Sequence, residues 1–213
     1  MISYLTYNNL HEYGPAFPSL FRLRYRSFKE RQGYAVSSYN GMEYDQYDTP
    51  ATIYLVYRDE VSGEALGLSR LTPVSQCCMI KDLWPELVND QSIFTDHDVW
   101  ESTRFCVERS LPAHVRRIIS NELVAAHVEL GMRLGIKNII GVMPTFILRS
   151  VFGKAGCSFE YLGGGIEVDN MLIRAAVMEI TPRQLLRIRQ TSQIKESVLL
   201  LNGGEYEDSK RAA

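Results

Sequence analysis

The sequence predicts a single α/β domain in which one central, mixed β-sheet carries helices packed on it. Two β-rich segments joined by a short turn lie in the first half, which indicates an antiparallel hairpin. Strand-like and helix-like segments alternate in the second half, which favours parallel pairing. A long helix with one apolar stripe lies between the two halves and offers a face to pack on a sheet. Both kinds of pairing within 213 residues indicate one mixed sheet.

The first half is predicted to begin with a helix and a hairpin. Aromatic residues recur at helical spacing over residues 18–31, and Gly33 follows as a stop signal. Residues 52–58 and 64–72 are rich in β-forming side chains, and residues 59–63 between them are typical of a hairpin turn. These signals predict one helix followed by two antiparallel strands.

The middle of the chain is predicted to hold a short helix, a strand and the clearest helix of the protein. The short helix is expected at residues 80–89 and the strand at residues 99–107. The long helix covers residues 112–134, because Pro112 suits a first helical turn and Gly135 ends an apolar stripe with helical periodicity.

Residues 136–143 are mostly apolar, as in a strand that is buried on both faces. The elements that follow are predicted from β-forming runs and from turn or capping residues. They are a helix at 145–154, strands at 157–162 and 171–180 around a turn at Gly163-Gly164-Gly165, and a last helix from Thr181 to about Gln190.

Composition excludes several classes of partner. The net charge of −2 lacks the basic excess of a nucleic-acid-binding domain. No apolar run approaches the ~20 residues of a membrane helix, and the start of the chain lacks the pattern of a signal peptide. We therefore expect a cytoplasmic protein with neither a nucleic-acid partner nor a membrane partner.

The four cysteines have no spacing typical of a zinc site, so we expect reduced thiols and no metal. One domain is expected over residues 1–201. Residues 202–213 are polar and rich in Gly, Glu and Lys, which predicts a disordered tail.

Two arginines lie where apolar side chains are expected. Because side chains alternate along a strand, Leu66, Leu68 and Arg70 are predicted to share one face. Burying an arginine beside leucines is costly unless a carboxylate or ligand pairs with it. A strand end from which Arg70 reaches water is the alternative. Arg24 poses the same question, since it shares a helix face with Phe28, and a solvated helix edge is the alternative.

Three carboxylates, those of Glu43, Asp45 and Asp48, interleave with tyrosines over six positions. An ordinary acidic loop is one interpretation. The other is a site that recognises a cation or positions an ammonium group through carboxylates and tyrosine faces. The spacing does not follow that of a calcium-binding loop.

The segment W-E-S-T-R-F at residues 100–105 puts Glu101 and Arg104 on opposite faces of a regular strand. Both charges are costly in a central strand, so a bulge at Arg104 and Phe105, or a position facing a cleft, is indicated. A solvent-exposed edge strand is the alternative.

Taken together and in this order, these residues resemble the acyl-homoserine-lactone synthase (autoinducer synthase) family. The strong motifs cover about residues 22–107, and a general similarity continues to about residue 180. Three departures bear on the shapes of the acyl and adenosine pockets. Tyr34 stands where the family usually has Trp, Trp84 where it usually has Phe, and Thr103 where it usually has Ser.

The resemblance implies a transferase with a fold similar to that of the GNAT acyltransferases, which makes an N-acyl-homoserine lactone for quorum sensing. In this reaction the amine of S-adenosylmethionine attacks the carbonyl of an acyl thioester. The carboxylate then displaces 5′-methylthioadenosine and closes the lactone. S-adenosylmethionine is a co-substrate, and no permanently bound cofactor is expected.

The resemblance also suggests roles for the charged and aromatic residues. Glu101 is the favoured base and Glu43 the alternative, with Arg104 as the third catalytic residue. Backbone N–H groups at the proposed bulge are candidates for oxyanion donors. The residues expected to bind S-adenosylmethionine are Arg24, Phe28, Tyr34, Asp45, Asp48, Arg70 and Phe105. The residues expected to line the acyl pocket are Trp84, Val142, Met143, Phe146 and Leu148, for which a plain core position is an equal alternative.

The expected acyl donor is an acyl carrier protein, with acyl-coenzyme A as the alternative. An acidic carrier needs a basic patch on the enzyme. The candidates are Arg149, Lys154, Arg174, Arg183, Arg187 and Arg189. A general GNAT-type N-acetyltransferase is a rival function, although the Q/R-x-x-G-x-G/A loop of that family is not found. A non-catalytic module that binds an acyl ligand is the second rival. The length, branching and oxidation state of the acyl chain, and the oligomeric state, are not read from the sequence.

Overall fold

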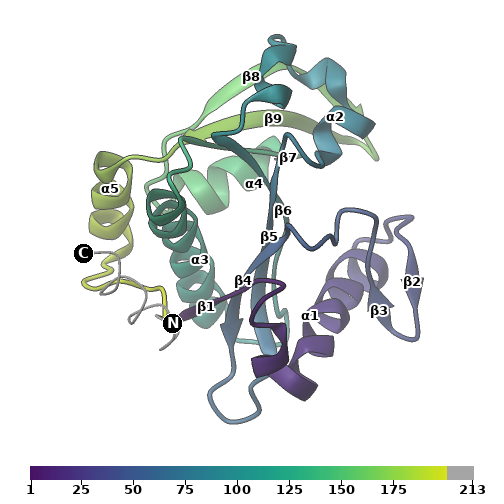
Figure 1. Ribbon diagram of the computed structural model, residues 1–213, viewed down its shortest axis with the longest axis vertical. Coiled ribbons are helices and arrows are strands. Elements are labelled where there is room, and N and C mark those ends of the chain that lie inside the picture. The colour runs from purple at the N-terminus through teal and green to yellow at the C-terminus, as the bar shows by residue number, and fades with distance from the viewer. Residues whose placement is uncertain (201–213) are drawn as a thin grey trace.

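A seven-stranded mixed sheet forms the centre of the molecule in the computed structural model, which describes residues 1–200 (Figure 1). Neighbouring strands are antiparallel except β6 and β7, which are parallel. The predicted mixed sheet is therefore confirmed. In spatial order the strands are β1 (Ile2–Leu5), β4 (Ile53–Arg58), β5 (Ala65–Pro73), β6 (Val99–Val107), β7 (Asn138–Pro144), β9 (Met171–Glu179) and β8 (Glu160–Val168).

Helices cover both faces of this sheet. Figure 1 shows α1 on one side of β4, β5 and β6, with α3, α4 and α5 on the other side. We call these two sides the α1 face and the α3 face. The helices are α1 (Phe17–Arg24) with its π-helical continuation η2 (Tyr25–Arg31), α2 (Met79–Leu83), α3 (Ala113–Leu134), α4 (Thr145–Ile147) with its continuation η5 (Leu148–Gly153), and α5 (Pro182–Ser192).

The short elements lie around the α1 face and at the end of the sheet formed by β9 and β8. A two-stranded ribbon lies beside α1 (Figure 1). The short elements are the ribbon strands β2 (Ser38–Tyr39) and β3 (Met42–Glu43) and the 3₁₀ turns η1 (Leu10–Ala16), η3 (Pro85–Leu87) and η4 (Gln91–Thr95). No helix among residues 1–200 has the length and apolar character needed to cross a membrane.

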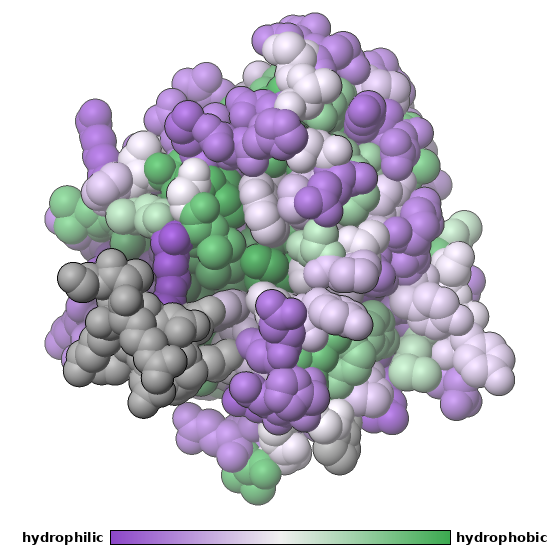
Figure 2. Space-filling model, viewed as in Figure 1, coloured by the Kyte–Doolittle hydropathy of each residue, from purple (hydrophilic) through white to green (hydrophobic). Residues whose placement is uncertain are grey.

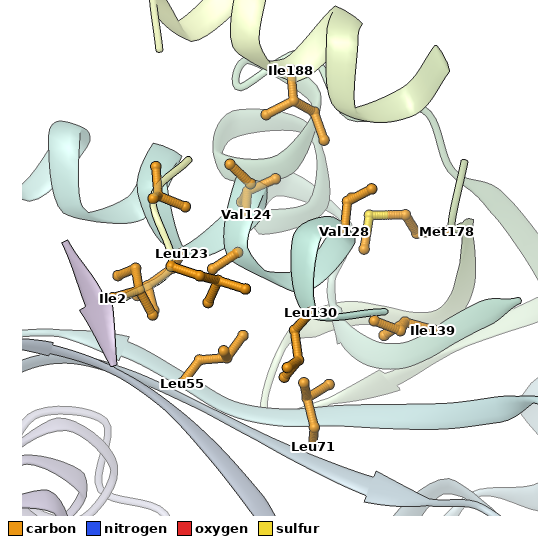
Figure 3. Packing of buried hydrophobic residues seen from close by; sticks show 14 of the residues in the cluster. Ile2, Leu55, Leu71, Leu123, Val124, Val128, Leu130, Ile139, Met178 and Ile188 are labelled. Carbon is orange, nitrogen blue, oxygen red and sulfur yellow. The ribbon is translucent and has the colours of Figure 1, made fainter. Parts of the chain in front are cut away.

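The largest core lies on the α3 face, where α3 packs between the sheet and α5 (Figure 3). Leu123 and Val128 of α3 are fully buried against strand residues such as Leu55 and against Ile188 of α5. Burying each such side chain stabilises the fold by ~1.5–3 kcal/mol. Gly67 of β5 permits this close packing, because a Cβ atom there would lie 2.4 Å from Cγ2 of Ile119.

The predicted turn at Gly163-Gly164-Gly165 is wrong, because these glycines lie inside β8. The turn between β8 and β9 is at Asp169 and Asn170, whose φ angles are 49° and 60°. Such left-handed conformations suit Asn and Asp at a tight hairpin. The glycines instead permit an irregular strand at a close approach, since a Cβ atom on Gly163 would lie 2.6 Å from the carbonyl oxygen of Leu87.

Leu66 does not share a face with Leu68, contrary to the prediction. Tyr57 pairs with Gly67 and Arg58 with Ala65, so Leu66 is the extra residue of a bulge in β5. Its side chain packs with the core of the α3 face, whereas Leu68 is buried in the core of the α1 face. A bulge reverses the alternation of side chains along a strand.

The helix predicted at residues 80–89 is shorter, because α2 ends at Leu83 and a 3₁₀ turn follows, and the strand predicted at 157–162 is β8, which runs six residues further to Val168. The other predicted strands and helices agree with the structure within a few residues at their ends. The strand β1 was not predicted. It pairs with β4 and is joined to the last described segment by a hydrogen bond from the Ile2 amide to the Val198 carbonyl, at 2.7 Å. The predicted domain end at residue 201 and the tail 202–213 lie outside the described residues.

Candidate active site

Charged side chains from four separate segments converge on the α1 face of the sheet. Arginines come from the end of α1, from β5 and from β6, and carboxylates come from β3 and the loop that follows it. We call this cluster the charge network. Its members are Arg24, Arg70, Arg104, Glu43, Asp45 and Asp48. The predicted convergence of these acids and arginines is therefore present in the structure.

Arg24 lies at the bottom of the charge network with no exposed surface. Its Nε donates to Glu43 at 2.5 Å, and its two terminal nitrogens bind the two oxygens of Asp48 at 2.6 and 2.9 Å. Burial alone would lower the pKa of Arg24, but the hydrogen bonds to Asp48 and Glu43 raise it. Burial alone would raise the pKa of Asp48, but its hydrogen bonds and opposite charges lower it below the usual range.

Arg70 is likewise fully buried. Its Nη1 and Nη2 bind Asp45 at 2.5 and 3.1 Å, and its Nε donates to the hydroxyl of Thr103 at 2.9 Å. Asp48 accepts a further bond from Nη1 at 3.0 Å and one from the hydroxyl of Tyr54 at 2.8 Å. Each buried charge therefore has an opposite charge and hydrogen bonds, as burial requires.

Arg104 lies at the outer edge of the charge network, where 13% of its side chain is exposed. Its Nη2 donates to Glu43 at 2.9 Å and to Asp45 at 2.6 Å. Its Nη1 contacts the sulfur of Met79 at 3.6 Å, which is a weak acceptor. The guanidinium also lies 5.4 Å from the centre of the Phe28 ring. This arginine therefore has one donor group directed at no carboxylate among the described residues.

A bulge in β6 brings Arg104 to this face, as the sequence predicted. Arg70 pairs with Thr103 and Leu68 with Cys106, so Arg104 and Phe105 together face one residue of β5. Arg104 has the left-handed φ of 55°, which is uncommon for a residue with a side chain. The bulge shifts the alternation, and Arg104 lies on the same face as Arg70. The opposite-face arrangement expected of a regular strand is therefore absent.

The same bulge turns Phe105 to the α3 face. Its ring packs 5.2 Å from Phe152 and 6.2 Å from His127, measured between ring centres. Phe105 was expected to contact S-adenosylmethionine, but its side chain lies across the sheet from the charge network. Phe28 and Tyr34, also expected there, stack on each other with ring centres 6.4 Å apart beside Arg104.

Glu101 lies beside the charge network and is fully buried. Its two oxygens accept hydrogen bonds from the backbone amides of Met79, at 2.7 Å, and Ile80, at 2.8 Å. The carboxylate therefore caps the first turn of α2, where anions are favoured. Burial raises the pKa of Glu101 to about 7, against the lowering effect of the two amides and of Arg70. A carboxyl group with this pKa is suited to exchange protons at neutral pH.

An apolar cavity of about 30 Å³ lies on the α3 face, between α3, η5, β7 and β9. Figure 2 shows apolar side chains gathered on this side of the molecule between α3 and α4, beneath β9. Met143 and Leu148, two of the predicted acyl-pocket residues, line this cavity. The other lining residues are Ser102, His127, Ile139, Ile140, Gly141, Phe152, Cys157, Phe159, Ala176, Val177 and Met178.

The other three predicted acyl-pocket residues do not line this cavity. Trp84 and Val142 pack against a separate apolar cluster, which η3 and η4 form with side chains of β7, β9 and β8. Phe146 is 57% exposed at the start of α4. The expected set is therefore divided between two cores and the surface, because the neighbouring strand residues Val142 and Met143 point to opposite faces.

Comparison with known proteins decides the family of the chain. The model of the family described as autoinducer synthase matches residues 9–188. The chain belongs to the autoinducer synthase family. An acyl-homoserine-lactone synthase of Rhizobium etli is 31% identical to this synthase over 158 residues, which cover 73% of this chain and 74% of the relative.

Two further similarities extend over nearly the whole synthase. The isovaleryl-homoserine lactone synthase of Bradyrhizobium diazoefficiens is 28% identical over 215 residues, which cover 100% of this chain and 94% of the relative. The structure of BjaI, a CoA-dependent acyl-homoserine lactone synthase, with SAM and isopentyl-CoA has a TM-score of 0.84. It is 27% identical and covers 95% of this chain and 93% of its own.

The chain is therefore an acyl-homoserine-lactone synthase, which is an acyltransferase. The resemblance drawn from the charged residues of the first half is confirmed, as is the GNAT-like arrangement of the sheet and helices. Among residues 1–200 of the synthase, no three His, Cys, Asp or Glu side chains are grouped so as to hold a metal ion.

Three of the six predicted basic-patch residues are engaged within the synthase. The guanidinium carbon of Arg174 lies 3.7 Å from the centre of the Tyr161 ring, and this arginine also donates to the Gly163 carbonyl. Arg189 pairs with Glu129 at 2.8 Å, and Nε of Arg187 donates to the Gly156 carbonyl at 2.9 Å. The other three are exposed on η5, on its C-cap and on α5, and they are Arg149, Lys154 and Arg183.

Sequence reasoning missed a polar cluster on the α3 face of the synthase, formed by Ser69, Ser102 and His127. All three side chains are buried. One signal was available, since His127 lies four residues after Leu123 on the apolar stripe of the long helix. Ser69 and Ser102 carried no signal, because serine is unremarkable at any single strand position.

Proposed function

We propose that the synthase binds S-adenosylmethionine against the exposed edge of the charge network, with Arg104 holding the carboxylate of the ligand. The observation that carries this proposal is the free donor group of Arg104, since Nη1 meets only the sulfur of Met79 among the described residues. A guanidinium donor beside partly exposed carboxylates suits a ligand with both charges. Asp45 and Asp48, whose side chains are each 10% exposed, are the anions available to the ammonium group.

The buried half of the charge network has a different role in this proposal. Arg24, Arg70 and Glu43 have no exposed surface, and they hold Asp45, Asp48 and Arg104 in place. They are positioning residues rather than direct ligands of S-adenosylmethionine. The stacked rings of Phe28 and Tyr34 form an aromatic wall beside Arg104 that suits the sulfonium or the adenine.

Glu101 is the base of the proposed mechanism. The ammonium group of the ligand first releases one proton to solvent. Glu101 removes a second proton from the resulting amine as the nitrogen forms a bond to the thioester carbonyl carbon. The carbon–sulfur bond of the thioester then breaks, and the thiolate leaving group takes up the proton held by Glu101. In the second step an oxygen of the ligand carboxylate attacks the carbon next to the sulfonium. That carbon–sulfur bond breaks, the lactone closes and 5′-methylthioadenosine leaves.

The bulge of β6 is the proposed source of oxyanion donors. A bulge leaves backbone groups outside the regular ladder, and such groups can stabilise a tetrahedral intermediate. The cavity on the α3 face is the proposed acyl pocket, because its lining is apolar and it lies directly across β6 from the charge network. Met143 and Leu148 line that pocket.

We propose acyl-coenzyme A as the donor, in place of the carrier protein favoured by sequence reasoning. The support is the similarity over nearly the full length to BjaI, whose structure contains isopentyl-CoA. The exposed residues Arg149 and Lys154 flank the cavity-lining residues Leu148 and Phe152 along the chain, and their positive charge suits the phosphates of coenzyme A. The acyl carrier protein is the competing donor in the test.

The test is an assay of the purified protein with S-adenosylmethionine and a panel of acyl groups, each supplied on coenzyme A and on acyl carrier protein. Chromatography with mass detection follows 5′-methylthioadenosine and the acyl-homoserine lactone. We expect equal amounts of both products and a higher kcat/KM with coenzyme A. Preference for the carrier protein would overturn the donor assignment. Acyl transfer without 5′-methylthioadenosine would overturn the mechanism.

A further inference from the structure

Tyr47 connects the loop after β3 (residues 44–52) with α2. Its side chain is only 3% exposed, and its ring centre lies 5.6 Å from the guanidinium carbon of Arg70. Its hydroxyl donates to Oδ2 of Asp82, on α2, at 3.0 Å. Burial and this hydrogen bond raise the pKa of Tyr47 to about 12, so the hydroxyl keeps the proton that it donates. Gln46 also contacts this hydroxyl, but it belongs to the same loop and does not reach across to α2 as Asp82 does.

The backbone of Tyr47 is tied to a proposed ligand of S-adenosylmethionine. Its amide donates to Oδ1 of Asp45 at 2.9 Å, and its carbonyl accepts from the hydroxyl of Thr52 at 2.9 Å. Asp45 is one of the two carboxylates available to the ammonium group of the ligand. Tyr47 is therefore held on the side of the site where the amine is proposed to bind.

α2 packs on the other side of the site. Figure 1 shows it beside the end of the sheet formed by β9 and β8. Ile80 is fully buried in the apolar cluster of that end, together with Ile173 and Ala175 of β9. The first turn of α2 holds Glu101 through the amides of Met79 and Ile80. The position of the proposed base thus depends on an element that packs in a different core from α1.

The hydrogen bond between Tyr47 and Asp82 joins these two sides. A base must lie within hydrogen-bonding reach of the proton that it removes, directly or through one water. A displacement of about 1 Å can lower the rate of an enzyme by about 10²-fold. Tyr47 contacts Asp45 through its backbone and α2 through its side chain, so it sets the distance between the ammonium site and Glu101.

We propose that Tyr47 and Asp82 are positioning residues of the synthase reaction, and that their hydrogen bond holds α2 and Glu101 at a fixed distance from the ammonium site. This inference rests on the proposed roles of Glu101 and Asp45. Tyr47 and Asp82 act through these two carboxylates and bind no substrate themselves. When the bond is lost, α2 keeps its core contacts but is no longer fixed relative to the loop. The chemical step then slows while S-adenosylmethionine still binds.

Asp82 also acts on Glu101 through its charge, and this effect can be separated from the hydrogen bond. Burial is the main cause of the raised pKa of Glu101, the charge of Asp82 adds to it, and Arg70 of β5 opposes it. Arg104 of β6 lies beyond Met79. Three further titratable groups interact with Glu101 and stay uncharged at neutral pH, because burial raises the pKa of each. They are Tyr47, Cys77 and Cys78.

The test measures kcat and the KM for S-adenosylmethionine by release of 5′-methylthioadenosine, with the best acyl thioester of the panel. Tyr47→Phe removes the donor hydroxyl, and Asp82→Ala removes its acceptor on α2. Each should lower kcat about 3- to 10-fold, the effect of one hydrogen bond, and leave the KM within about twofold. Glu86→Ala is the matched control, because Glu86 is an exposed acid just after α2, and it should change neither constant. Wild-type kcat in Tyr47→Phe and Asp82→Ala would overturn the inference.

Asp82→Asn gives a readout that a merely structural role would not move. Its amide oxygen still accepts from the Tyr47 hydroxyl, so kcat should stay within about twofold of the wild type. The lost negative charge favours ionised Glu101, so the acid limb of kcat/KM should move to lower pH by a few tenths of a pH unit. A kcat as low as that of Asp82→Ala would overturn the inference. A wild-type profile without an acid limb would instead reject Glu101 as the base, and thus the proposed mechanism itself.

Discussion

At the scale of single residues, burial separates charges that are chemically alike. Arg24 and Arg104 both bind Glu43, but Arg24 has no exposed surface and Arg104 keeps a donor directed at no carboxylate of the described residues. The first therefore supports the site and the second can meet a ligand. A buried ion pair that loses one partner leaves an uncompensated charge, and an exposed pair does not.

Replacing Arg24 tests this difference. Arg24→Met should lower the free energy of unfolding by ~3–5 kcal/mol, because Glu43 and Asp48 lose their main partner in a buried site. Arg26→Met is the matched control on the same helix, since Arg26 is 45% exposed in its pair with Glu108 and should contribute less than ~1 kcal/mol. Urea denaturation measures both. Equal effects of the two substitutions would contradict the supporting role of Arg24.

The raised pKa of Glu101 predicts how activity depends on pH. A base must be ionised to accept a proton, and burial raises this pKa to about 7. We therefore expect kcat/KM to fall as the pH is lowered through about 7, by up to tenfold per unit on the acid side. A flat profile between pH 5.5 and 7.5 would exclude Glu101 as the base.

Glu101→Gln is the companion experiment. It should reduce turnover by ~10²–10⁴-fold. Circular dichroism should show a retained fold, although the amide can accept only one of the two backbone bonds that Glu101 now accepts from Met79 and Ile80. An active Glu101→Gln enzyme would remove the assignment.

Sequence reasoning reached the identity of the charged residues but not their depth. Glu43, Asp45, Asp48, Arg70 and Arg104 were each ambiguous when taken alone, and their order along the chain made them informative. Exposure depends on packing between α1, β3, β5 and β6, which are far apart in sequence. For this reason a direct ligand could not be distinguished from a supporting residue before the fold was known.

At the scale of elements, irregular strands decide which residues meet. The bulge in β6 brings Arg104 into the charge network and turns Phe105 to the α3 face. The two costly charges in one strand indicated this bulge in advance. The bulge at Leu66 gave no comparable sign, because leucine is acceptable on either face of a buried strand. The glycines of β8 were misread as a turn, since glycine serves both turns and close approaches.

The packing of α3 on β5 gives a prediction at this scale. Gly67→Ala should lower the free energy of unfolding by ~1–3 kcal/mol, because the added Cβ would lie 2.4 Å from Ile119 and force α3 to shift. Gly164→Ala is the control, since a Cβ atom there meets no atom within 4 Å. It should change stability by less than ~1 kcal/mol. Chemical denaturation compares the two, and a neutral Gly67→Ala would contradict the described packing.

At the scale of the whole molecule, β6 is the wall between two different environments. The charge network lies on its α1 face and the apolar cavity on its α3 face. The parallel pairing of β6 with β7 spans only Val99 to Glu101, just before the bulge. A polar substrate and an acyl chain can thus approach the same strand from opposite sides, as the proposed reaction requires.

The order of the main elements and the mixed sheet could be predicted, because hydrophobic periodicity and turn residues are local signals. The strand order depends on contacts between segments far apart in the sequence, and the hydrogen bond of β1 to Val198 joins the two ends of the described chain. Local patterns do not carry that information. Met143 and Leu148 of the cavity were among the expected acyl-pocket residues, but the rest of its lining escaped prediction for the same reason, since β6, β7, β9, α3 and η5 all contribute to it.

The central claim is that Arg104, at the exposed edge of the charge network, binds the carboxylate of S-adenosylmethionine. Titration calorimetry of S-adenosylmethionine into the wild type, Arg104→Met and Arg26→Met tests it directly. The Kd should rise by about 10- to 100-fold in Arg104→Met, as expected for a lost hydrogen bond between charged groups, and should stay unchanged in Arg26→Met. A folded Arg104→Met protein that binds S-adenosylmethionine with the wild-type Kd would contradict the claim.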